Sequence, residues 1–385
     1  MYVDMRICYI NYSRYGIIGP LVHAGQFLAE LKKIHHDLVV DMPLSQQDEK
    51  KSFFAEKVMV DNLREVRLLL VMITRRTIHE ISLLRRVKPD VVILRQGRYL
   101  SAIILCRLMK IPLIVEVNGP VLEDQFAPKK QRIRGGAFWQ WLEIKMLSIP
   151  DHIMVVSETL KGYYVNCGIP YEKITSVPNG VDIHTFHPEV SGERVRKKLG
   201  LQGKTIIGFS GNFAPWHGLH LLADAMKTIH ESNKYKDLAL LLIGKPGELF
   251  TMPDFPDAIT TFTGHIPHEE MPEYLAVIDI FIAPYPEINP FYFSPLKIFE
   301  AMSMGKPVIA SAQGQICELI TDQVSGLLYP PRDQTALINA IESLIIDPLL
   351  KDKLGRQART VMETKFTWKN NARKMLDLCK QVRSK

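Results

Sequence analysis

Short apolar runs alternate with helical patterns along most of this chain, and this alternation restricts the folds that it can adopt. A short apolar run between two helices is typical of a strand in a parallel sheet, which is buried on both faces. The rhythm occurs twice, so the sequence predicts an α/β protein with two doubly wound, Rossmann-like domains that face each other across a cleft. The expected strands are residues 5–11, 38–42, 91–94, 113–117, 152–156 and 174–177, then 205–210, 239–243, 260–262, 280–283, 308–310 and 326–329.

The boundary between the two domains is predicted near residue 184. Pro178-Asn179-Gly180 is a turn signal, and a polar stretch over 188–203 follows it. Residues 1–183 hold 25 Lys and Arg against 19 Asp and Glu, and residues 366–385 hold 6 against 1. This shared sign favours a final helix that returns to the first domain. The predicted domains are therefore 1–183 with 366–385, and 184–365.

Residues 293–311 predict a short helix followed by a buried strand. The Ser294 hydroxyl suits the N-cap, where it accepts from an unpaired backbone N–H, and Pro295 suits the first helical position. Gly305 can adopt the left-handed conformation that ends a helix, and the apolar run 308–310 follows it.

The first turn of this helix predicts an anion site. The free N–H groups of Leu296 and Lys297, the positive end of the helix dipole and the Lys297 ammonium come together there, so a phosphate would bind. Glu300 lies one turn further along the same face, where a carboxylate can accept from the two hydroxyls of a ribose. An ordinary capped helix with a Lys–Glu pair is the alternative.

Glycine-rich turns follow several predicted strands, which is where open parallel sheets bind ligands. In each of them the backbone can approach a phosphate or a base closely, or the glycine simply serves a tight turn. The candidate positions are Gly16 and Gly19 after the first strand, Gly211, Asn212 and His217 in the segment 211–218, Gly244 and Lys245 after 239–243, and Gly264 and His265 after 260–262.

Basic clusters in the first half suggest an anionic partner. Arg75-Arg76, Arg85-Arg86 and the segment 129–134 can meet anionic lipid or a phosphorylated substrate, or they are solvated surface charge. Nucleic acid is not expected, because no binding motif or interleaved aromatics accompany these clusters.

Two further features bear on location and on metal binding. The apolar runs are too short for a membrane span and the start lacks the form of a signal peptide, so we expect a cytoplasmic protein, either free or peripheral on the inner face of the membrane. Five cysteines are scattered singly, without metal-ligand spacing, which predicts buried thiols rather than disulfides or zinc.

The order of these motifs resembles the retaining glycosyltransferases of family 4, which have the GT-B fold. The resemblance covers nearly the whole chain and is clearest over residues 174–332. It implies that the first domain binds an acceptor and the second a nucleotide-sugar donor, with a final helix that returns to the first domain. The motifs that carry it are 178–182, 211–218, 243–244, 264–265, 281–284, 294–300 and 305–308.

The resemblance also assigns roles to residues of the second domain. Glu300 matches the second glutamate of the family's pair, which holds the ribose hydroxyls, whereas Tyr292 stands where the first glutamate usually contacts the donor sugar. The backbone N–H of Leu296 matches a diphosphate contact. Pro295 replaces a common glycine there, and Lys297 is expected to compensate, as in the Ser-Pro-Leu-Lys version of the motif.

Two further positions depart from the family pattern. Asn212 and His217 stand where the family has an arginine and a lysine. Asn118, in Glu116-Val117-Asn118-Gly119-Pro120, stands where many members place a histidine near the reacting centre. The catalytic candidates are therefore Lys297, Glu300 and Asn118.

The expected reaction is transfer of a sugar to a hydroxyl acceptor with retention of configuration, in the synthesis of a polysaccharide, glycolipid or other glycoconjugate. No Asp-x-Asp pair occurs in the sequence, so we expect no metal and no cofactor, the nucleotide-sugar being a co-substrate. The helix start and Lys297 would stabilise the departing nucleoside diphosphate, whose phosphate oxygen can take the acceptor proton.

Two alternatives remain open on the same fold. A nucleotide-sugar epimerase would need acid/base carboxylates, for which Glu116 and Glu318 are the candidates. A non-catalytic partner subunit that binds nucleotide or membrane is suggested by the missing first glutamate and the weakened basic pair. Consumption of the donor separates the transferase from the inert subunit.

Overall fold

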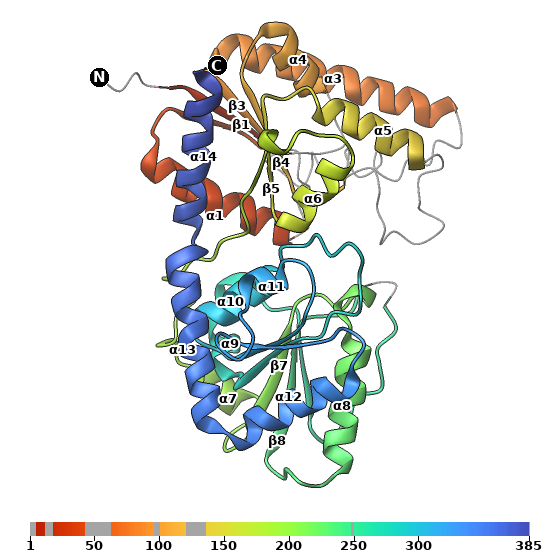
Figure 1. Ribbon diagram of the computed structural model, residues 1–385, viewed down its shortest axis with the longest axis vertical. Coiled ribbons are helices and arrows are strands. Elements are labelled where there is room, and N and C mark those ends of the chain that lie inside the picture. Colours follow the sequence, from red (N-terminus) through yellow and green to blue (C-terminus); the bar gives the residue numbers. More distant parts are fainter. Residues whose placement is uncertain are drawn as a thin grey trace. The chain divides into compact units, whose positions relative to one another are not determined.

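The computed structural model describes residues 5–11, 18–42, 63–95, 101–120, 136–247 and 250–384. The chain divides into two compact units (Figure 1). Unit 1 comprises Met1–Pro178 and Trp368–Lys385, and unit 2 comprises Asn179–Thr367. The division falls at Pro178, within the turn signal and a few residues before the predicted boundary.

Unit 1 is built on a six-stranded parallel sheet of order β2-β1-β3-β4-β5-β6. Cys8 of β1 lies opposite Val39 of β2 on one side and Val92 of β3 on the other. Strands β1, β3, β4 and β5 are buried along their whole length, as their apolar sequences require. The strands are β1 (Ile7–Asn11), β2 (Leu38–Asp41), β3 (Val91–Arg95), β4 (Leu113–Val117), β5 (His152–Val155) and β6 (Ile174–Ser176).

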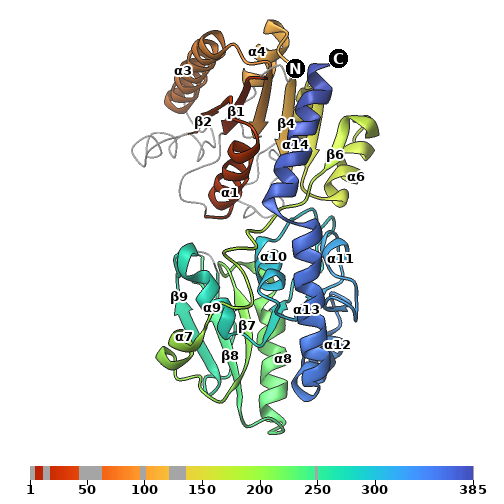
Figure 2. The same cartoon turned by 90° about the vertical axis from the view of Figure 1, so that its left-hand side faces the viewer.

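Helices cover this sheet. α3 packs against α4, and α1 packs against the returning helix α14, as Figures 1 and 2 show. Ala372, Met375 and Cys379 of α14 are fully buried, so apolar packing holds this helix on unit 1. The helices are α1 (Ile18–Ile34), α3 (Leu63–Val87), α4 (Ser101–Met109), α5 (Gly136–Leu147), α6 (Glu158–Asn166) and α14 (Trp368–Arg383).

Unit 2 repeats the architecture with a parallel sheet of order β12-β11-β10-β7-β8-β9. Each predicted strand of this domain is present within one or two residues. The strands are β7 (Thr205–Ser210), β8 (Leu238–Ile243), β9 (Thr260–Gly264), β10 (Ile280–Ala283), β11 (Val308–Ser311) and β12 (Leu327–Tyr329). The predicted fold of two Rossmann-like domains is confirmed.

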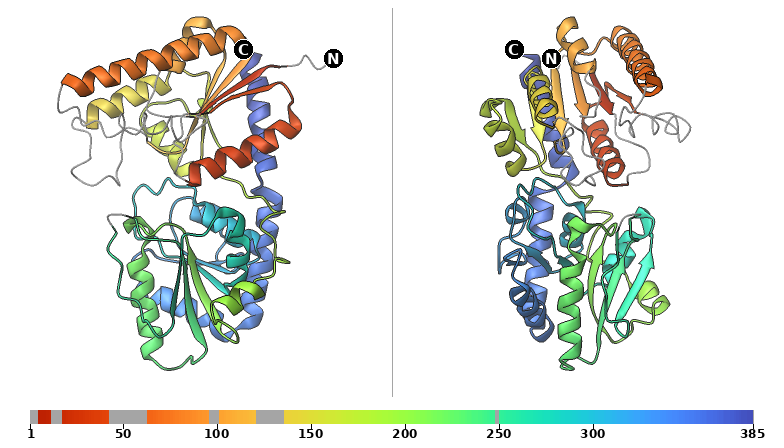
Figure 3. Two further views of the ribbon diagram at one scale, coloured as in Figure 1. Left: turned by 180° about the vertical axis from the view of Figure 1, so that it is seen from behind. Right: turned by 90° about the vertical axis from the view of Figure 1, so that its right-hand side faces the viewer.

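Two apolar clusters fill the faces of this second sheet. One forms beneath α8 (Leu219–Glu231) and α12 (Gln334–Ile346). The left view of Figure 3 shows the ribbon of this unit from behind. The other forms beneath α9 (Met271–Val277), α10 (Leu296–Ser303), α11 (Ile316–Leu319) and α13 (Pro348–Lys365). A short helix, α7 (Glu193–Lys198), precedes β7. Helix α10 therefore has a fixed place above the sheet, with its start near the carboxyl ends of the strands.

No helix within the described ranges is both long enough and apolar enough to span a bilayer.

Candidate nucleotide-binding site

Helix α10 begins at Leu296, one residue later than the sequence predicted. Pro295 precedes the first turn with an extended backbone (φ −78°, ψ 97°), and no side chain caps this end. The predicted N-cap role of Ser294 is wrong, because its Oγ accepts from the backbone N–H of Asn179 at 3.0 Å, and its carbonyl accepts from Asn179 Nδ2 at 2.7 Å. The first turn is therefore left open to an external acceptor.

The far end of α10 agrees with the sequence. Gly305 adopts a left-handed conformation (φ 68°), and its N–H donates to the carbonyl of Met302 at 3.0 Å. The N–H of Lys306 donates to the carbonyl of Ala301 at 3.0 Å. This pattern ends the helix and turns the chain into β11.

The ammonium of Lys297 is buried in the first turn of α10. Its Nζ has no hydrogen-bond partner within the part of the chain that the structure describes. It lies 4.1 Å from the centre of the Phe209 ring and 5.8 Å from that of Tyr285. Burial lowers the pKa of Lys297 to about 7, although Glu300 raises it. Burial of a cation without a hydrogen-bond acceptor costs free energy, and a bound anion would supply the acceptor that this ammonium lacks.

The turn after β7 lies directly beneath this ammonium. Gly211 has φ 129°, and a Cβ on it would come within 2.7 Å of Lys297 Nζ. A Cβ on Gly244, after β8, would come within 1.8 Å of the carbonyl oxygen of Gly211. Both glycines are therefore required by the close approach of the two turns and of the lysine. The two turns and Lys297 therefore share one edge of the sheet, where the N–H of Gly211 itself donates to the carbonyl of Ile243 at 2.9 Å.

Glu300 lies one turn further along α10, with a side chain that is 13% exposed. Its Oε1 lies 3.9 Å from His268 Nδ1. Burial raises the pKa of Glu300 to about 8, and Lys297 lowers it. A buried carboxylate with few protein partners can accept hydrogen bonds from the two hydroxyls of a diol.

His217 is placed beside Lys297 but brings no charge. Its Nδ1 lies 2.7 Å from the carbonyl oxygen of Asn212, which fixes Nδ1 as the protonated nitrogen of a neutral ring. Burial and Lys297 hold the pKa of His217 well below its usual range, although the bond to Asn212 raises it. His217 therefore shapes the turn after β7, and Lys297 is the cation of this group.

The remaining predicted donor-site residues are dispersed around this group. Gly264 (φ 72°) is bridged to Gly244, which places the turn after β9 at the same edge. Lys245 and His265 are exposed on these turns. Tyr292 is 5% exposed and packs 4.9 Å from the Phe293 ring, so it offers no carboxylate to a donor sugar.

Three residues of the site were missed by the sequence reading. Phe209 and Tyr285 surround the Lys297 ammonium with aromatic faces, which attract a cation. Gln313 fixes the loop after β10, because its Nε2 donates to the carbonyl of Pro286 at 2.9 Å and its Oε1 accepts from the N–H of Ile288 at 3.0 Å. Phe209 lies near the carboxyl end of a predicted strand, and Tyr285 and Gln313 follow two others. This position is the signal that could have found them.

The three predicted site residues of unit 1 have different outcomes in the structure. Gly16 lies outside the described residues. Gly19 lies in the first turn of α1 and not in a loop, since Pro20 is tolerated that close to a helix start. Asn118 follows β4, where its Nδ2 donates to Glu116 Oε1 at 3.2 Å.

The epimerase candidates Glu116 and Glu318 differ in environment. Glu116 is fully buried. Burial raises its pKa, but Arg95 and His23 lower it further, to about 2. It therefore stays ionised near neutral pH and has no proton to donate to a substrate there. Glu318 is exposed on α11.

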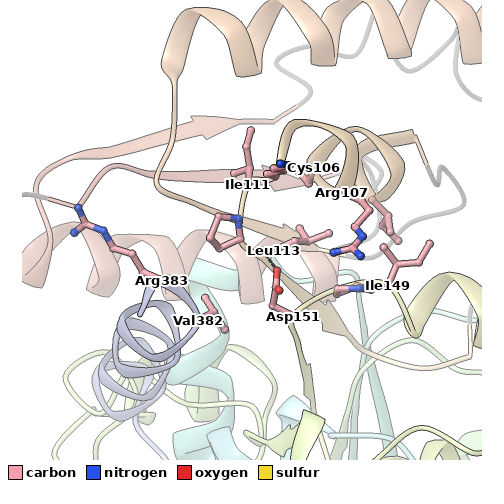
Figure 4. Close-up of a pocket in the computed structure, with 12 residues that line it drawn as sticks. Cys106, Arg107, Ile111, Leu113, Ile149, Asp151, Val382 and Arg383 are labelled. Atoms are coloured by element: carbon pink, nitrogen blue, oxygen red, sulfur yellow. Dashed lines mark hydrogen bonds between the residues drawn. The ribbon is translucent and has the colours of Figure 1, made fainter. Parts of the chain in front are cut away.

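A separate cavity of about 280 Å³ lies at the opposite, amino edge of the sheet in unit 1 (Figure 4). The ends of α4 and α14 and the starts of β4 and β5 form it, and Asp151 accepts there from the N–H of Leu113 at 2.8 Å. None of the predicted site residues lines it. Within the described ranges, no three His, Cys, Asp or Glu side chains are grouped to hold a metal ion.

Unit 2 combines a doubly wound parallel sheet with an uncapped helix start at the carboxyl edge of that sheet. The fold is that of GT-B glycosyltransferases. The structure aligns with HepE of Anabaena, solved in complex with UDP, at a TM-score of 0.72 and 17% identity over 98% of this chain and 100% of that one.

Sequence comparison assigns each unit separately. Residues 19–185 match the model of Glycosyltransferase Family 4, and residues 204–347 match that of Glycosyl transferases group 1. Each unit thus matches one of the two family models.

Curated relatives agree with this assignment. The putative glycosyltransferase YtcC of Bacillus subtilis is 27% identical over 66% of this chain and 64% of its own length. The alignment therefore spans less than two thirds of that relative. The UDP-Gal:alpha-D-GlcNAc-diphosphoundecaprenol alpha-1,3-galactosyltransferase of Escherichia coli is 26% identical over 77% of this chain and 76% of its own length.

Proposed function

We propose that this protein transfers a sugar from a nucleotide-sugar to a hydroxyl acceptor with retention of configuration. The observation that carries the proposal is the buried ammonium of Lys297, which lies over Gly211 in the first turn of α10 and has no hydrogen-bond acceptor among the described residues. A diphosphate supplies the charge and the acceptors that this ammonium lacks. Retention follows from the resemblance to family 4.

Each group then has a role in the transfer. Lys297 and the N–H groups of the first turn bind the diphosphate and stabilise its charge as it departs. Glu300 accepts from the ribose hydroxyls. The departing phosphate oxygen takes the proton of the acceptor hydroxyl, so the reaction needs no separate general base and, in this proposal, no metal or cofactor.

UDP is the nucleotide that we propose first. HepE is described in complex with UDP and with UDP-glucose, and the relative from Escherichia coli is named for UDP-Gal. The donor sugar is left open, because Tyr292 stands where the family's sugar-binding glutamate is expected.

Transfer is tested by incubating the protein with UDP-, GDP-, ADP- and TDP-sugars in excess EDTA, with and without sugar and lipid-linked acceptors. We expect one donor to be consumed, with formation of a glycosylated acceptor, and consumption to persist in EDTA. Conversion of the donor to its epimer without acceptor would support the epimerase. No consumption of any donor would support the inert subunit, and rescue by Mg²⁺ or Mn²⁺ would contradict metal independence.

We further propose that unit 1 meets an anionic membrane or a lipid-diphosphate acceptor. Arg75, Arg85 and Arg86 of α3 are exposed. Arg76 is excluded from this surface, because it pairs with Asp41 at 3.1 Å and with Glu80 at 3.3 Å. The predicted cluster 129–134 lies outside the described residues.

Reversal of the three exposed arginines of α3 to glutamate is expected to weaken binding to anionic vesicles about a hundred-fold, since each cation contributes roughly 1 kcal/mol near anionic lipid. Binding of the wild type should also fall steeply with salt. Charge reversal of Lys197, Lys236 and Lys353, which are exposed on unit 2, is the matched control. Equal partition of the wild type onto neutral and anionic vesicles in a sedimentation assay would contradict this proposal.

A further inference from the structure

Glu116 is the centre of a buried polar cluster at the carboxyl edge of the sheet in unit 1. It lies one residue before the end of β4, which pairs with β3, and β1 is the next strand beyond β3. Its side chain is fully buried. Its carboxylate is contacted by Tyr9 Oη at 3.2 Å, His23 Nε2 at 2.9 Å, Arg95 Nη1 and Asn118 Nδ2 at 3.2 Å.

Four separate segments therefore converge on one carboxylate. Tyr9 belongs to β1, His23 to α1 and Arg95 to β3, while Asn118 follows β4. A carboxylate paired with a guanidinium is ionised and can only accept hydrogen bonds. This requirement fixes the side-chain amide of Asn118, because only its NH₂ group can face Glu116. The amide oxygen is then turned away from the cluster.

The position of Asn118 places this amide oxygen where a ligand can reach it. Asn118 follows the carboxyl end of β4, the edge of a parallel sheet at which ligands bind. Unlike Glu116, Asn118 retains partial exposure. Its amide oxygen is a neutral acceptor of known orientation at this edge. The ligands that such an acceptor recognises are hydroxyl groups.

We infer that Glu116 is a positioning residue, which orients Asn118 so that its amide oxygen accepts a hydrogen bond from a hydroxyl of the sugar donor or of the acceptor. The inference rests on the proposed transfer function. Among the described residues, Tyr9, His23 and Arg95 are the other charged or titratable groups that face Glu116, and they hold the carboxylate in place.

The test is the pH profile of Asn118→Asp. When protonated, the new carboxyl group can donate to Glu116 and present its carbonyl oxygen outward, as the amide does. When ionised, it repels Glu116 and loses that orientation. We expect donor consumption relative to wild type to fall about ten-fold or more from pH 5 to pH 8. In Asn118→Asp/Glu116→Gln the fall should vanish.

A second readout is independent of activity. Repulsion by Glu116 raises the folded-state pKa of the new carboxyl above its unfolded value, so Asn118→Asp should lose stability, relative to wild type, as pH rises through this range. Chemical denaturation from pH 5 to pH 8 measures the loss, and the Glu116→Gln background should remove it. Tyr9→Phe is the matched control, because it removes another donor to Glu116 without altering residue 118.

The outcomes separate this inference from the proposed function. A stability difference that does not vary with pH would show that Glu116 does not orient residue 118. A stability loss without any change in the rate or KM for donor or acceptor would show that the oxygen meets no substrate. Either result overturns the inference while leaving the transfer function intact. A wild-type protein that consumes no donor overturns both. An altered KM for one substrate alone identifies which sugar supplies the hydroxyl.

Discussion

Lys297→Met is expected to lower the affinity for the nucleoside diphosphate by about 2–3 kcal/mol, which is the scale of a charge-assisted hydrogen bond. The maximal transfer rate should fall about 10²–10³-fold, because the same ammonium faces the charge that develops on the leaving group. Methionine preserves the length of the side chain and its contact with Phe209. Calorimetry and donor-consumption assays measure the two effects.

Lys306→Met is the matched control at the other end of α10. Lys306 is half-buried, and desolvation lowers its pKa to about 8, but its Nζ donates to the carbonyl of Ala276 at 2.8 Å. Loss of Lys306 should therefore reduce stability and spare nucleotide affinity. Loss of Lys297, which has no such acceptor among the described residues, should not reduce stability. Equal nucleotide affinity in Lys297→Met and wild type would remove Lys297 from the site.

Glu300→Gln is expected to weaken nucleoside diphosphate binding by about 1–3 kcal/mol, since an amide accepts the ribose hydroxyls less strongly than a carboxylate. The loss should be largest for a ribonucleotide. A 2′,3′-dideoxy nucleotide should bind wild type and Glu300→Gln with similar affinity, because it has no hydroxyls to donate. Unchanged affinity for the ribonucleotide in calorimetry would exclude Glu300 from the ribose site.

The pH dependence of binding should differ in sign between these two variants. Phosphate binds the protonated form of Lys297, whose pKa is about 7, so binding through Lys297 weakens as pH rises above 7. Ribose binds the ionised form of Glu300, whose pKa is about 8, so binding through Glu300 strengthens as pH rises towards 8. Affinity should therefore fall with pH in Glu300→Gln, rise in Lys297→Met, and vary little in wild type between pH 7 and 8.

The fold was largely readable from the sequence because its signals are local. The apolar run 239–243 predicted β8, observed at Leu238–Ile243, and the run 308–310 predicted β11, observed at Val308–Ser311. Gly305 ended α10 as expected, since a positive φ after a helix is a local property of glycine. The proximity of Lys297 and Glu300 followed from helical spacing in the same way.

Long-range contacts account for what the sequence did not predict. Ser294 is a residue type that favours the N-cap, but Asn179, far earlier in the chain, donates hydrogen bonds to its hydroxyl and to its carbonyl. The aromatic rings around Lys297 come from β7 and from the loop after β10. The partners of Glu116 come from four segments that periodicity cannot bring together. Local propensity describes each element, while the tertiary arrangement decides which polar groups remain available to a ligand.

A crystal structure of the protein with UDP bound tests the central claim most directly. The account predicts the diphosphate at the start of α10, about 3 Å from Lys297 Nζ and from the backbone N–H of Leu296, with both ribose hydroxyls donating to Glu300. A nucleotide whose diphosphate lies away from α10, or whose ribose does not reach Glu300, would contradict it.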